Sequence, residues 1–432
     1  MPQKVAFTTL GCRLNQAESD AMAEELASSG IGTVAGDEAP DLVVVNTCTV
    51  TREATKASRS AIRRAVRANP DAKVVVVGCY AVSDPDEVTA IDGVDLVLGN
   101  DEKERFAEVL GEARLVPPVL QIGGLRAPQL PYRVRANLKV QTGCDEWCTF
   151  CIIPKTRGPL RSLDEDRLID EARAKVAAGA RELVLTGVHL GKYTYDQGGD
   201  ERSLIRLFER LLAIDGVWRL RLSSILSQHL TDEVLAFMAA EPRICRFLHV
   251  PLQAGDDGVL SAMNRPYDIA GYMDSITRAK AALPGLALAT DIIVGFPGES
   301  DDAFDATMDV VRTVRYSKLH VFRYSARPDT AAAEMRDEVH PDVKKERSKR
   351  LIALGNEIRA DFLQQHLADS VEVLVEDERV VDGVTVCSGQ TEDFVRVWFE
   401  DGGLLGAVVE IEGQEVRADG IRGGTMKRIV RR

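Results

Sequence analysis

The sequence contains no apolar run of about 18 residues and therefore no candidate for a membrane-spanning helix. A secretion signal is missing too, because Met1-Pro2-Gln3-Lys4 leads directly into a strand-like segment. We therefore expect a cytoplasmic protein with no membrane partner. Low-complexity tracts and short repeats are also absent. The 432 residues, 45% hydrophobic and 28% charged, have the composition of a globular chain with several cores.

An excess of positive charge is missing as well, since 54 Lys and Arg against 67 Asp and Glu give a net charge of −13. Binding to nucleic-acid phosphates normally needs a basic surface, so any RNA site in this chain must be local. One candidate is a predicted helix whose basic residues recur every three or four positions, which fits a phosphate track and a solvated face equally well. A basic C-terminus is the second. The two sets are Arg52, Lys56, Arg59, Arg63 and Arg67, and Lys427, Arg428, Arg431 and Arg432.

The hydrophobic pattern of residues 1–113 predicts an N-terminal domain with a parallel α/β layer. Apolar, β-branched runs alternate there with helical patterns, as in sheets that are buried on both faces. The predicted strands are 5–10, 42–46, 74–77 and 94–98. Residues 114–134 are rich in Pro and Gly and predict a linker.

A second α/β series occupies residues 135–366, where six strand-then-helix repeats predict a partial (β/α)6 barrel. Its predicted strands are 138–141, 182–185, 219–222, 247–250, 288–294 and 318–322. A long helical pattern over 341–367 leads into residues 367–432, which predict a small all-β barrel. The strands expected there are 371–375, 394–399 and 407–411.

Cys144, Cys148 and Cys151 lie in the segment GCDEWCTFC, just after a predicted strand. In a chain without an export signal, clustered cysteines favour metal ligation or catalysis over disulfides. Three thiolates within eight residues can bind three irons of a 4Fe-4S cube and leave the fourth iron open to an exogenous ligand. A zinc site or three unrelated core cysteines are the alternatives that this spacing leaves open.

Cys12, Cys48 and Cys79 each follow a predicted strand of the first layer, in the segments TLGCRLN, VNTCTVT and VVGCYA. The carboxyl ends of parallel strands converge on one edge of a sheet, so these three cysteines can meet. Lone cysteines are usually buried as small hydrophobes, but these lie at strand ends beside Gly, Thr or Asn. We therefore favour a second cluster with its own open iron. Cys245 and Cys387 have no partner spacing and are interpreted as structural.

The six cysteines in these contexts resemble those of the methylthiotransferase family, and the similarity continues through longer segments. These are TLGCRLNQAESD, VNTCTVT, CTFCIIPKTRGPLRS, ELVLTGVHL, LHVPLQAGDDGVLSAMNRPY, TDIIVGFPGES and VFRYSARPDTAAAEM. The C-x3-C-x2-C spacing, with Phe150 before its third cysteine, also resembles the radical S-adenosylmethionine (SAM) superfamily. The resemblance implies an N-terminal cluster domain, a radical SAM core and a C-terminal RNA-binding barrel called TRAM.

The resemblance also implies the chemistry, which the cofactors carry, so we assign no catalytic side chain. Two 4Fe-4S clusters are implied. One binds SAM at its open iron and yields a 5′-deoxyadenosyl radical, while the other carries the methylthio group. A carbon radical suits a strong, unactivated adenine C–H bond, which ordinary acid–base groups cannot activate. The implied partners are the tRNA anticodon stem-loop and a reductant protein such as flavodoxin or ferredoxin.

Three segments, GCRLNQAES, NTCTVT and YSARPDTAA, most resemble the branch that converts N6-threonylcarbamoyladenosine next to the tRNA anticodon into its 2-methylthio derivative. Leu163 and the segment SSILSQHL depart from that branch. The alternatives are isopentenyladenosine in tRNA and an aspartate of a ribosomal protein. A non-catalytic iron-sulfur RNA-binding sensor would be expected to have a fourth cysteine at each cluster, and the sequence does not provide one.

The ends of the predicted barrel strands provide candidate contacts to SAM. Small residues at Thr186-Gly187 and Val294-Gly295 let a backbone approach a nucleoside, although a simple turn explains them equally well. The expected contacts are Phe150, Thr186, Gly187, Ser223, Gln253, Asp291, Val294 and Gly295. Arg323 and Arg327 could pair with the carboxylate of a threonylcarbamoyl group, but exposed surface arginines are the favoured interpretation.

Overall fold

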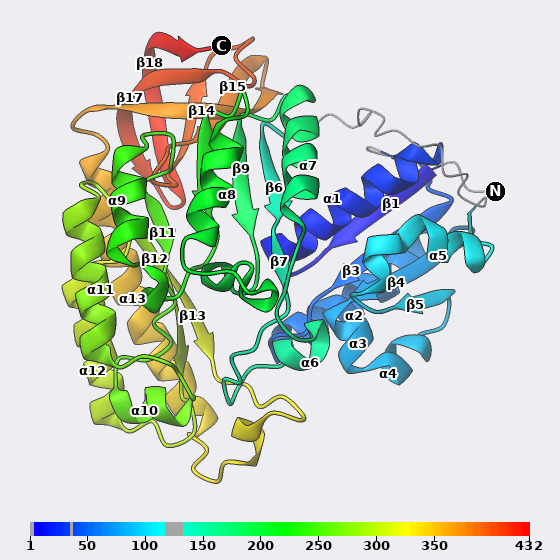
Figure 1. Ribbon diagram of the computed structural model, residues 1–432, viewed down its shortest axis with the longest axis horizontal. Helices are drawn as coiled ribbons and strands as arrows, with labels where there is room; N and C mark the ends of the chain where they lie inside the picture. The colour runs from blue at the N-terminus through cyan, green and yellow to red at the C-terminus, as the bar shows by residue number, and fades with distance from the viewer. Residues whose placement is uncertain (1–3, 35–37, 117–132) are drawn as a thin grey trace.

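The computed structural model describes residues 4–34, 38–116 and 133–432. Figure 1 shows an N-terminal α/β unit on the right, a half barrel in the centre and left, and a small β-barrel at the top. Most of the predicted linker, residues 117–132, lies outside the described residues. Within the described ranges, no helix is both long and apolar enough to cross a membrane.

The N-terminal unit is a five-stranded parallel sheet in the order β2-β1-β3-β4-β5. Its strands are β1 (Lys4–Thr9), β2 (Gly32–Thr33), β3 (Leu42–Thr47), β4 (Lys73–Gly78) and β5 (Leu96–Leu98). The helices α1 (Arg13–Ser28) and α5 (Phe106–Glu112) share one hydrophobic core with the sheet, and α2 (Arg52–Ala68), α3 (Cys79–Ser83) and α4 (Pro85–Thr89) share another. Because both faces are covered, the central strands are continuous Val runs.

The second unit contains six parallel strands, which confirms the predicted repeats. They are β6 (Arg135–Lys139), β9 (Glu182–Thr186), β10 (Arg219–Leu222), β11 (Phe247–His249), β12 (Ala287–Val294) and β13 (Lys318–Arg323). They form two three-stranded sheets, β10-β9-β6 and β11-β12-β13. Two isolated parallel bridges connect these sheets, one from Leu220 to Ile244 and one from Ser224 to His249. Within the described part of the chain β6 and β13 do not pair, so the barrel stays open on one side.

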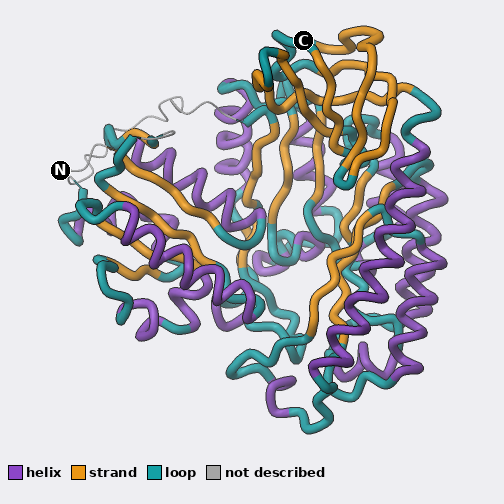
Figure 2. Tube along the Cα trace, turned by 180° about the vertical axis from the view of Figure 1, so that it is seen from behind, coloured by secondary structure: helices purple, strands orange, loops and turns teal. Residues whose placement is uncertain are grey.

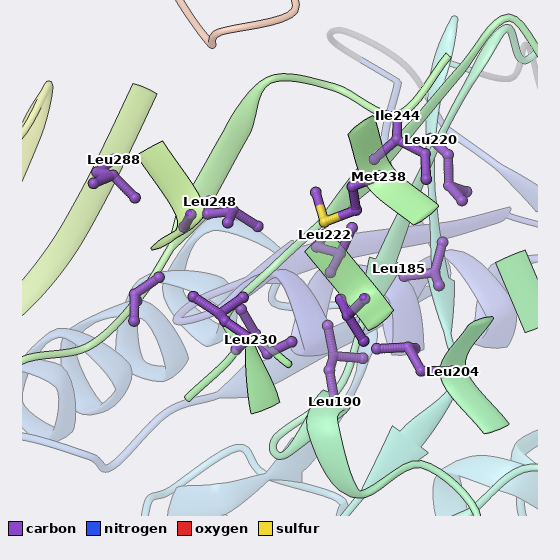
Figure 3. Close-up of a cluster of buried hydrophobic side chains, with 14 of the residues drawn as sticks. Leu185, Leu190, Leu204, Leu220, Leu222, Leu230, Met238, Ile244, Leu248 and Leu288 are labelled. Carbon is purple, nitrogen blue, oxygen red and sulfur yellow. The ribbon is translucent and has the colours of Figure 1, made fainter. Parts of the chain in front are cut away.

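Helices cover the outside of the half barrel. They are α7 (Glu165–Ala177), α8 (Ser203–Leu212), α9 (Asp232–Ala240), α11 (Ile269–Ala282), α12 (Asp301–Val314) and α13 (Pro341–Gln365). Figure 3 shows how Leu185, Leu220 and Leu222 from the strands gather with Leu204 of α8 and Met238 of α9. Each such leucine contributes about 1.5–3 kcal/mol by leaving water, so this core holds the strand ends in place.

The C-terminal unit is a closed barrel in the order β14-β15-β16-β18-β17. Its strands are β14 (Ser370–Val381), β15 (Val384–Gln390), β16 (Arg396–Glu400), β17 (Val408–Arg417) and β18 (Gly420–Arg431). It covers the amino ends of half-barrel strands, where Arg219 at the start of β10 donates to the carbonyl of Gln390 (2.9 Å) and Phe247 packs on Phe394 (4.9 Å between centroids). Figure 2 shows the same arrangement from behind.

Candidate functional site

Cys12, Cys48 and Cys79 follow β1, β3 and β4, which are neighbours in the N-terminal sheet. The glycines before two of them let the loops close. Gly11 has a φ of +94°, and a Cβ there would come within 2.9 Å of the Cys48 sulfur. Gly78, with a φ of +102°, would carry a Cβ only 2.6 Å from the carbonyl oxygen of Thr47. The fold therefore brings this N-terminal triad together at one sheet edge.

The N-terminal triad is buried at two of its cysteines and accessible to solvent at the third. Burial, reinforced by the nearby Cys79 and Cys12, raises the pKa of the Cys48 thiol to about 11. Cys48 and Cys79 are buried, whereas Cys12 is exposed and lines a cavity of about 350 Å³ together with Arg13 and Arg135. Three nearby sulfurs with one accessible side suit a cluster that has an open iron.

Cys144, Cys148 and Cys151 form the radical triad, on a loop that follows β6 and the short strand β7 (Gln141–Thr142). Backbone hydrogen bonds fix this loop, because Thr149 donates to Met263 (3.1 Å) and accepts from Ala332 (2.8 Å). The side-chain amide of Asn264 also donates to the Trp147 carbonyl at 2.9 Å. The three sulfurs are therefore carried by a loop that the half barrel braces.

Two donors point at sulfur atoms of the radical triad. The backbone N–H of Glu146 lies 3.4 Å from the Cys144 Sγ, and Nη1 of Arg265 lies 3.1 Å from the Cys148 Sγ. Burial raises the pKa of Cys144 to about 11 and that of Cys151 to about 12. Iron binding requires thiolates, and such donors stabilise thiolates. The site therefore fits an iron-sulfur cluster.

A zinc ion was the alternative occupant for clustered cysteines. Across the described residues, no three His, Cys, Asp or Glu side chains converge enough to hold a single metal ion. Structural zinc needs such convergence, normally by four ligands around one point. The thiolates of a cube instead bind irons at different corners, so they stay further apart.

Most of the predicted SAM contacts lie at the carboxyl ends of adjacent half-barrel strands. Thr186 is the last residue of β9, Val294 is the last residue of β12, and Ser223 directly follows β10. The Ser223 hydroxyl is buried without a hydrogen-bond partner among the described residues, which leaves it free for a ligand. Gln253 follows β11 and pairs with Asp291, to whose carbonyl its N–H donates at 2.9 Å.

The remaining predicted contacts have packing roles that the structure shows directly. A Cβ on Gly295, which has a φ of +71°, would lie 2.3 Å from the Lys344 side chain of α13. A Cβ on Gly187 would meet the side-chain oxygen of Gln141 at 3.0 Å. Phe150 packs edge-on against Phe296, with ring centroids 6.4 Å apart. Contact of these residues with SAM stays a prediction.

A polar group inside the half barrel was not predicted from the sequence. Nε2 of His249 lies 3.1 Å from Oδ1 of Asp291, and its Nδ1 lies 3.2 Å from the Ser224 hydroxyl. The ring of His320 lies 5.6 Å from that of His249. The period-two alternation of β11 could have revealed His249, since Leu248 packs in the outer core and its neighbours must point inward.

The prediction for Arg327 was wrong, because the favoured interpretation placed this side chain on the exposed surface. It is only 7% exposed, and its Nη2 donates to the Thr49 hydroxyl at 2.5 Å. Arg323, by contrast, is exposed and lies 3.5 Å from Glu53. Thr49 follows Cys48 directly, so Arg327 connects the end of the half barrel to the N-terminal triad.

A second contact joins the surroundings of the two triads. The side-chain nitrogen of Asn100 donates to the Thr156 carbonyl at 2.6 Å and lies 3.8 Å from the Cys79 sulfur. Thr156 belongs to α6 (Ile153–Arg157), which begins two residues after Cys151. The N-terminal triad therefore packs against the segment that leaves the radical triad.

The predicted basic stripe lies on α2, and its helical structure is confirmed. Four of its residues are exposed, whereas Arg59 contacts the Tyr80 hydroxyl (3.2 Å) and pairs with Glu87. In the C-terminal basic set, Arg428 pairs with Glu410 at 2.6 Å. Cys245 and Cys387 are buried in separate units, in line with a structural role.

Two family models match separate parts of the chain, one in the N-terminal unit and one in the half barrel. Residues 4–99 match the uncharacterized protein family UPF0004, and residues 138–311 match the radical SAM superfamily. Among solved structures, the radical SAM methyltransferase TsrM from Kitasatospora setae has a TM-score of 0.57 at 16% identity and covers 77% of each chain. That likeness supports the fold.

Curated relatives match over nearly the whole chain. The threonylcarbamoyladenosine tRNA methylthiotransferase MtaB of Bacillus subtilis is 38% identical and covers 94% of this chain and 93% of its own. MtaB of Thermotoga maritima is 34% identical over 96% of both chains. The tRNA-2-methylthio-N(6)-dimethylallyladenosine synthase of Jannaschia sp. is also 34% identical, over 98% of this chain and 94% of its own.

Proposed function

The chain belongs to the radical SAM methylthiotransferases and is an enzyme of that class, and from this premise we propose that it methylthiolates N6-threonylcarbamoyladenosine next to the tRNA anticodon. The observation that carries the proposal is that the surroundings of the N-terminal triad contact the segment that leaves the radical triad. Its product would be 2-methylthio-N6-threonylcarbamoyladenosine. The small C-terminal barrel is consistent with the TRAM barrel expected of the family.

The family matches imply SAM and iron-sulfur cofactors, and we assign one 4Fe-4S cluster to each triad. When bound, the cluster of Cys144, Cys148 and Cys151 would supply SAM binding and the electron for its cleavage, and the cluster of the N-terminal triad would carry the methylthio group. The chain would hold these groups in place. Arg265 and the Glu146 N–H orient thiolates, while the open Ser223 hydroxyl provides a polar contact at the strand ends.

The curated relatives include members of both tRNA branches. The threonylcarbamoyl branch is supported by the segments GCRLNQAES, NTCTVT and YSARPDTAA and by the 38% identity to a named member. The anticodon stem-loop, a reductant such as flavodoxin or ferredoxin, and the domain limits 1–113, 135–366 and 367–432 belong to the same proposal. The exposed arginines of α2 are the proposed phosphate contacts.

Reconstitution under anaerobic conditions should give about eight iron and eight sulfide ions per chain, because each triad is expected to hold one cube. Iron and sulfide analysis measures this directly. Replacing Cys144, Cys148 and Cys151 together with Ala should halve both values. A content of about four in the intact chain would contradict the assignment of two clusters.

Deletion of the gene should remove 2-methylthio-N6-threonylcarbamoyladenosine from cellular tRNA, and the unmethylthiolated nucleoside should accumulate. Mass spectrometry of digested tRNA measures both nucleosides in one sample. Complementation with the intact gene should restore the product, and a Cys144→Ala gene should not. Loss of the methylthio derivative of isopentenyladenosine instead would assign the enzyme to the other tRNA branch.

A further inference from the structure

A cluster of buried charges joins the N-terminal unit to the half barrel. Its centre is Glu18 of α1, which pairs with Lys103 (2.7 Å) of the short helix η1 (Glu102–Arg105) and with Lys139 (3.1 Å) of β6. Arg157 of α6 is the third cation, 2.8 Å from Glu18. The side chains of Glu18, Lys103 and Arg157 are at most 2% exposed. We call these four residues the charged junction.

The charged junction is not electrically balanced. Around it, Glu104 accepts from Lys139 (3.3 Å) and from Arg161 (2.6 Å). Arg161 is 43% exposed and is also stabilised by Asp101 and Asp196, so it is not part of the buried charge. Glu18 and Glu104 then face the three inward cations Lys103, Lys139 and Arg157, which leaves a surplus of one positive charge. A buried charge without a partner is costly, so this surplus positive charge is stabilised by an anionic neighbour.

Thiolates of the N-terminal triad would supply this negative charge, because Lys103 and Arg157 donate to Asn46 and Asn15, which lie two residues before Cys48 and three residues after Cys12. Burial by itself lowers the pKa of Arg157. The negative charge of Glu18, and to a smaller extent that of Cys79 and Cys12, raises this pKa above its usual value. The pKa of Lys103 is lowered by burial, and both Glu18 and Cys79 counteract this effect. The cations are therefore close enough to these sulfurs for a thiolate charge to act on them.

Hydrogen bonds connect the same cations to the segment that carries Cys48. Lys103 donates to the side-chain oxygen of Asn46 at 2.9 Å, and Arg157 donates to that of Asn15 at 2.5 Å. Asn15 in turn donates to the Thr47 carbonyl at 2.9 Å. Asn46 and Thr47 directly precede Cys48, so a shift in the charged junction would move the triad.

We propose that the charged junction is the charge partner of the N-terminal triad. Its surplus positive charge stabilises the thiolates and the reduced state of the cluster that they hold, and its ion pairs fix the N-terminal sheet against the half barrel. These are positioning residues, because none of them is a ligand. The inference rests on the proposed function in taking Cys12, Cys48 and Cys79 as cluster ligands.

The test uses the full-length chain with Cys144, Cys148 and Cys151 replaced by Ala, so that only the N-terminal cluster is loaded. A redox titration followed by electron paramagnetic resonance gives its midpoint potential. Adding Lys103→Met should shift the potential to more negative values, on the order of tenfold in the reduction equilibrium, which is about 59 mV for one electron. Lys103→Arg keeps the charge and should leave the potential near that of the parent.

Glu18→Gln provides a test of sign, because it removes a negative charge and should shift the potential in the positive direction. A purely structural role would not give opposite shifts. Lys175→Met is the matched control, since Lys175 also joins the two units through Glu24 (3.2 Å) but faces two carboxylates, Glu24 and Glu171, and so adds no surplus positive charge. Its potential should equal that of the parent.

Unchanged potentials in the loaded Lys103 and Glu18 variants, or shifts of the same sign, would overturn this inference and leave the proposed function intact. An equal shift in the Lys175 variant would do the same. If the Lys103→Met variant of this parent does not bind its cluster, Lys103→Met is introduced instead into the chain that keeps all six cysteines. The content of both clusters is then measured. Loss of the N-terminal cluster alone supports the inference, and equal loss of both clusters contradicts it. A parent chain without iron would contradict the ligand assignment itself.

Discussion

Replacing Cys144 with Ala should reduce the formation of 5′-deoxyadenosine from SAM to the level seen without enzyme, even with a strong reductant. The three cysteines of the radical triad lie on one braced loop, and the cluster would lose one of only three protein ligands. SAM cleavage requires an electron from that cluster. The expected effect is therefore complete loss and not a partial decrease.

The measurement is chromatography of 5′-deoxyadenosine after anaerobic incubation with SAM and dithionite. Cys245→Ala is the matched control, because Cys245 is a buried cysteine of the same half barrel that has no partner cysteine. That variant should keep most of its activity after a modest loss of stability of about 1 kcal/mol. Normal SAM cleavage by the Cys144 variant would show that this residue is not a ligand of the radical cluster.

Replacing Cys12, Cys48 and Cys79 with Ala should abolish methylthio transfer while leaving SAM cleavage largely intact. These cysteines lie on a separate sheet, and the radical loop is held by Met263, Asn264 and Ala332, which all belong to the half barrel. Cleavage should decrease somewhat, because loss of the thiolates leaves the charged junction without its anionic neighbour. A looser interface would then exclude water less well from the reaction site.

The decisive comparison is the ratio of methylthiolated adenosine to 5′-deoxyadenosine in one reaction with threonylcarbamoylated tRNA. The ratio should approach zero in the triple variant. Cys387→Ala, in the C-terminal barrel, should leave it unchanged, because among the described residues the hydrogen-bond partners of that buried thiol are all in its own unit. Normal amounts of methylthiolated product from the triple variant would show that the N-terminal cysteines are structural.

Strand prediction succeeded where both faces of a sheet are buried and was incomplete in the small barrel, where β14, β16 and β17 were predicted and two strands were missed. The Val runs at 42–46 and 74–77 lie within β3 and β4. The two barrel strands missed were β15 and β18, in which glycines interrupt the β-branched pattern. Those glycines are required by close packing, since a Cβ on Gly423 would lie 2.4 Å from the side chain of Ile411. A barrel of five strands leaves no room there for the residues that usually mark a strand.

The sequence alone determined the reaction class, because the cysteine spacing is local and the family segments surround it. It also determined which strand ends carry the N-terminal triad, since parallel strands place their carboxyl ends on one edge. Only the tertiary structure showed that Arg327 is buried beside Thr49 and that Glu18 holds three cations. Glu18 lies 85 residues from Lys103 and 139 from Arg157, and a charged residue in sequence normally indicates a solvated surface. Long-range burial of charge depends on how the units pack, and no local pattern encodes it.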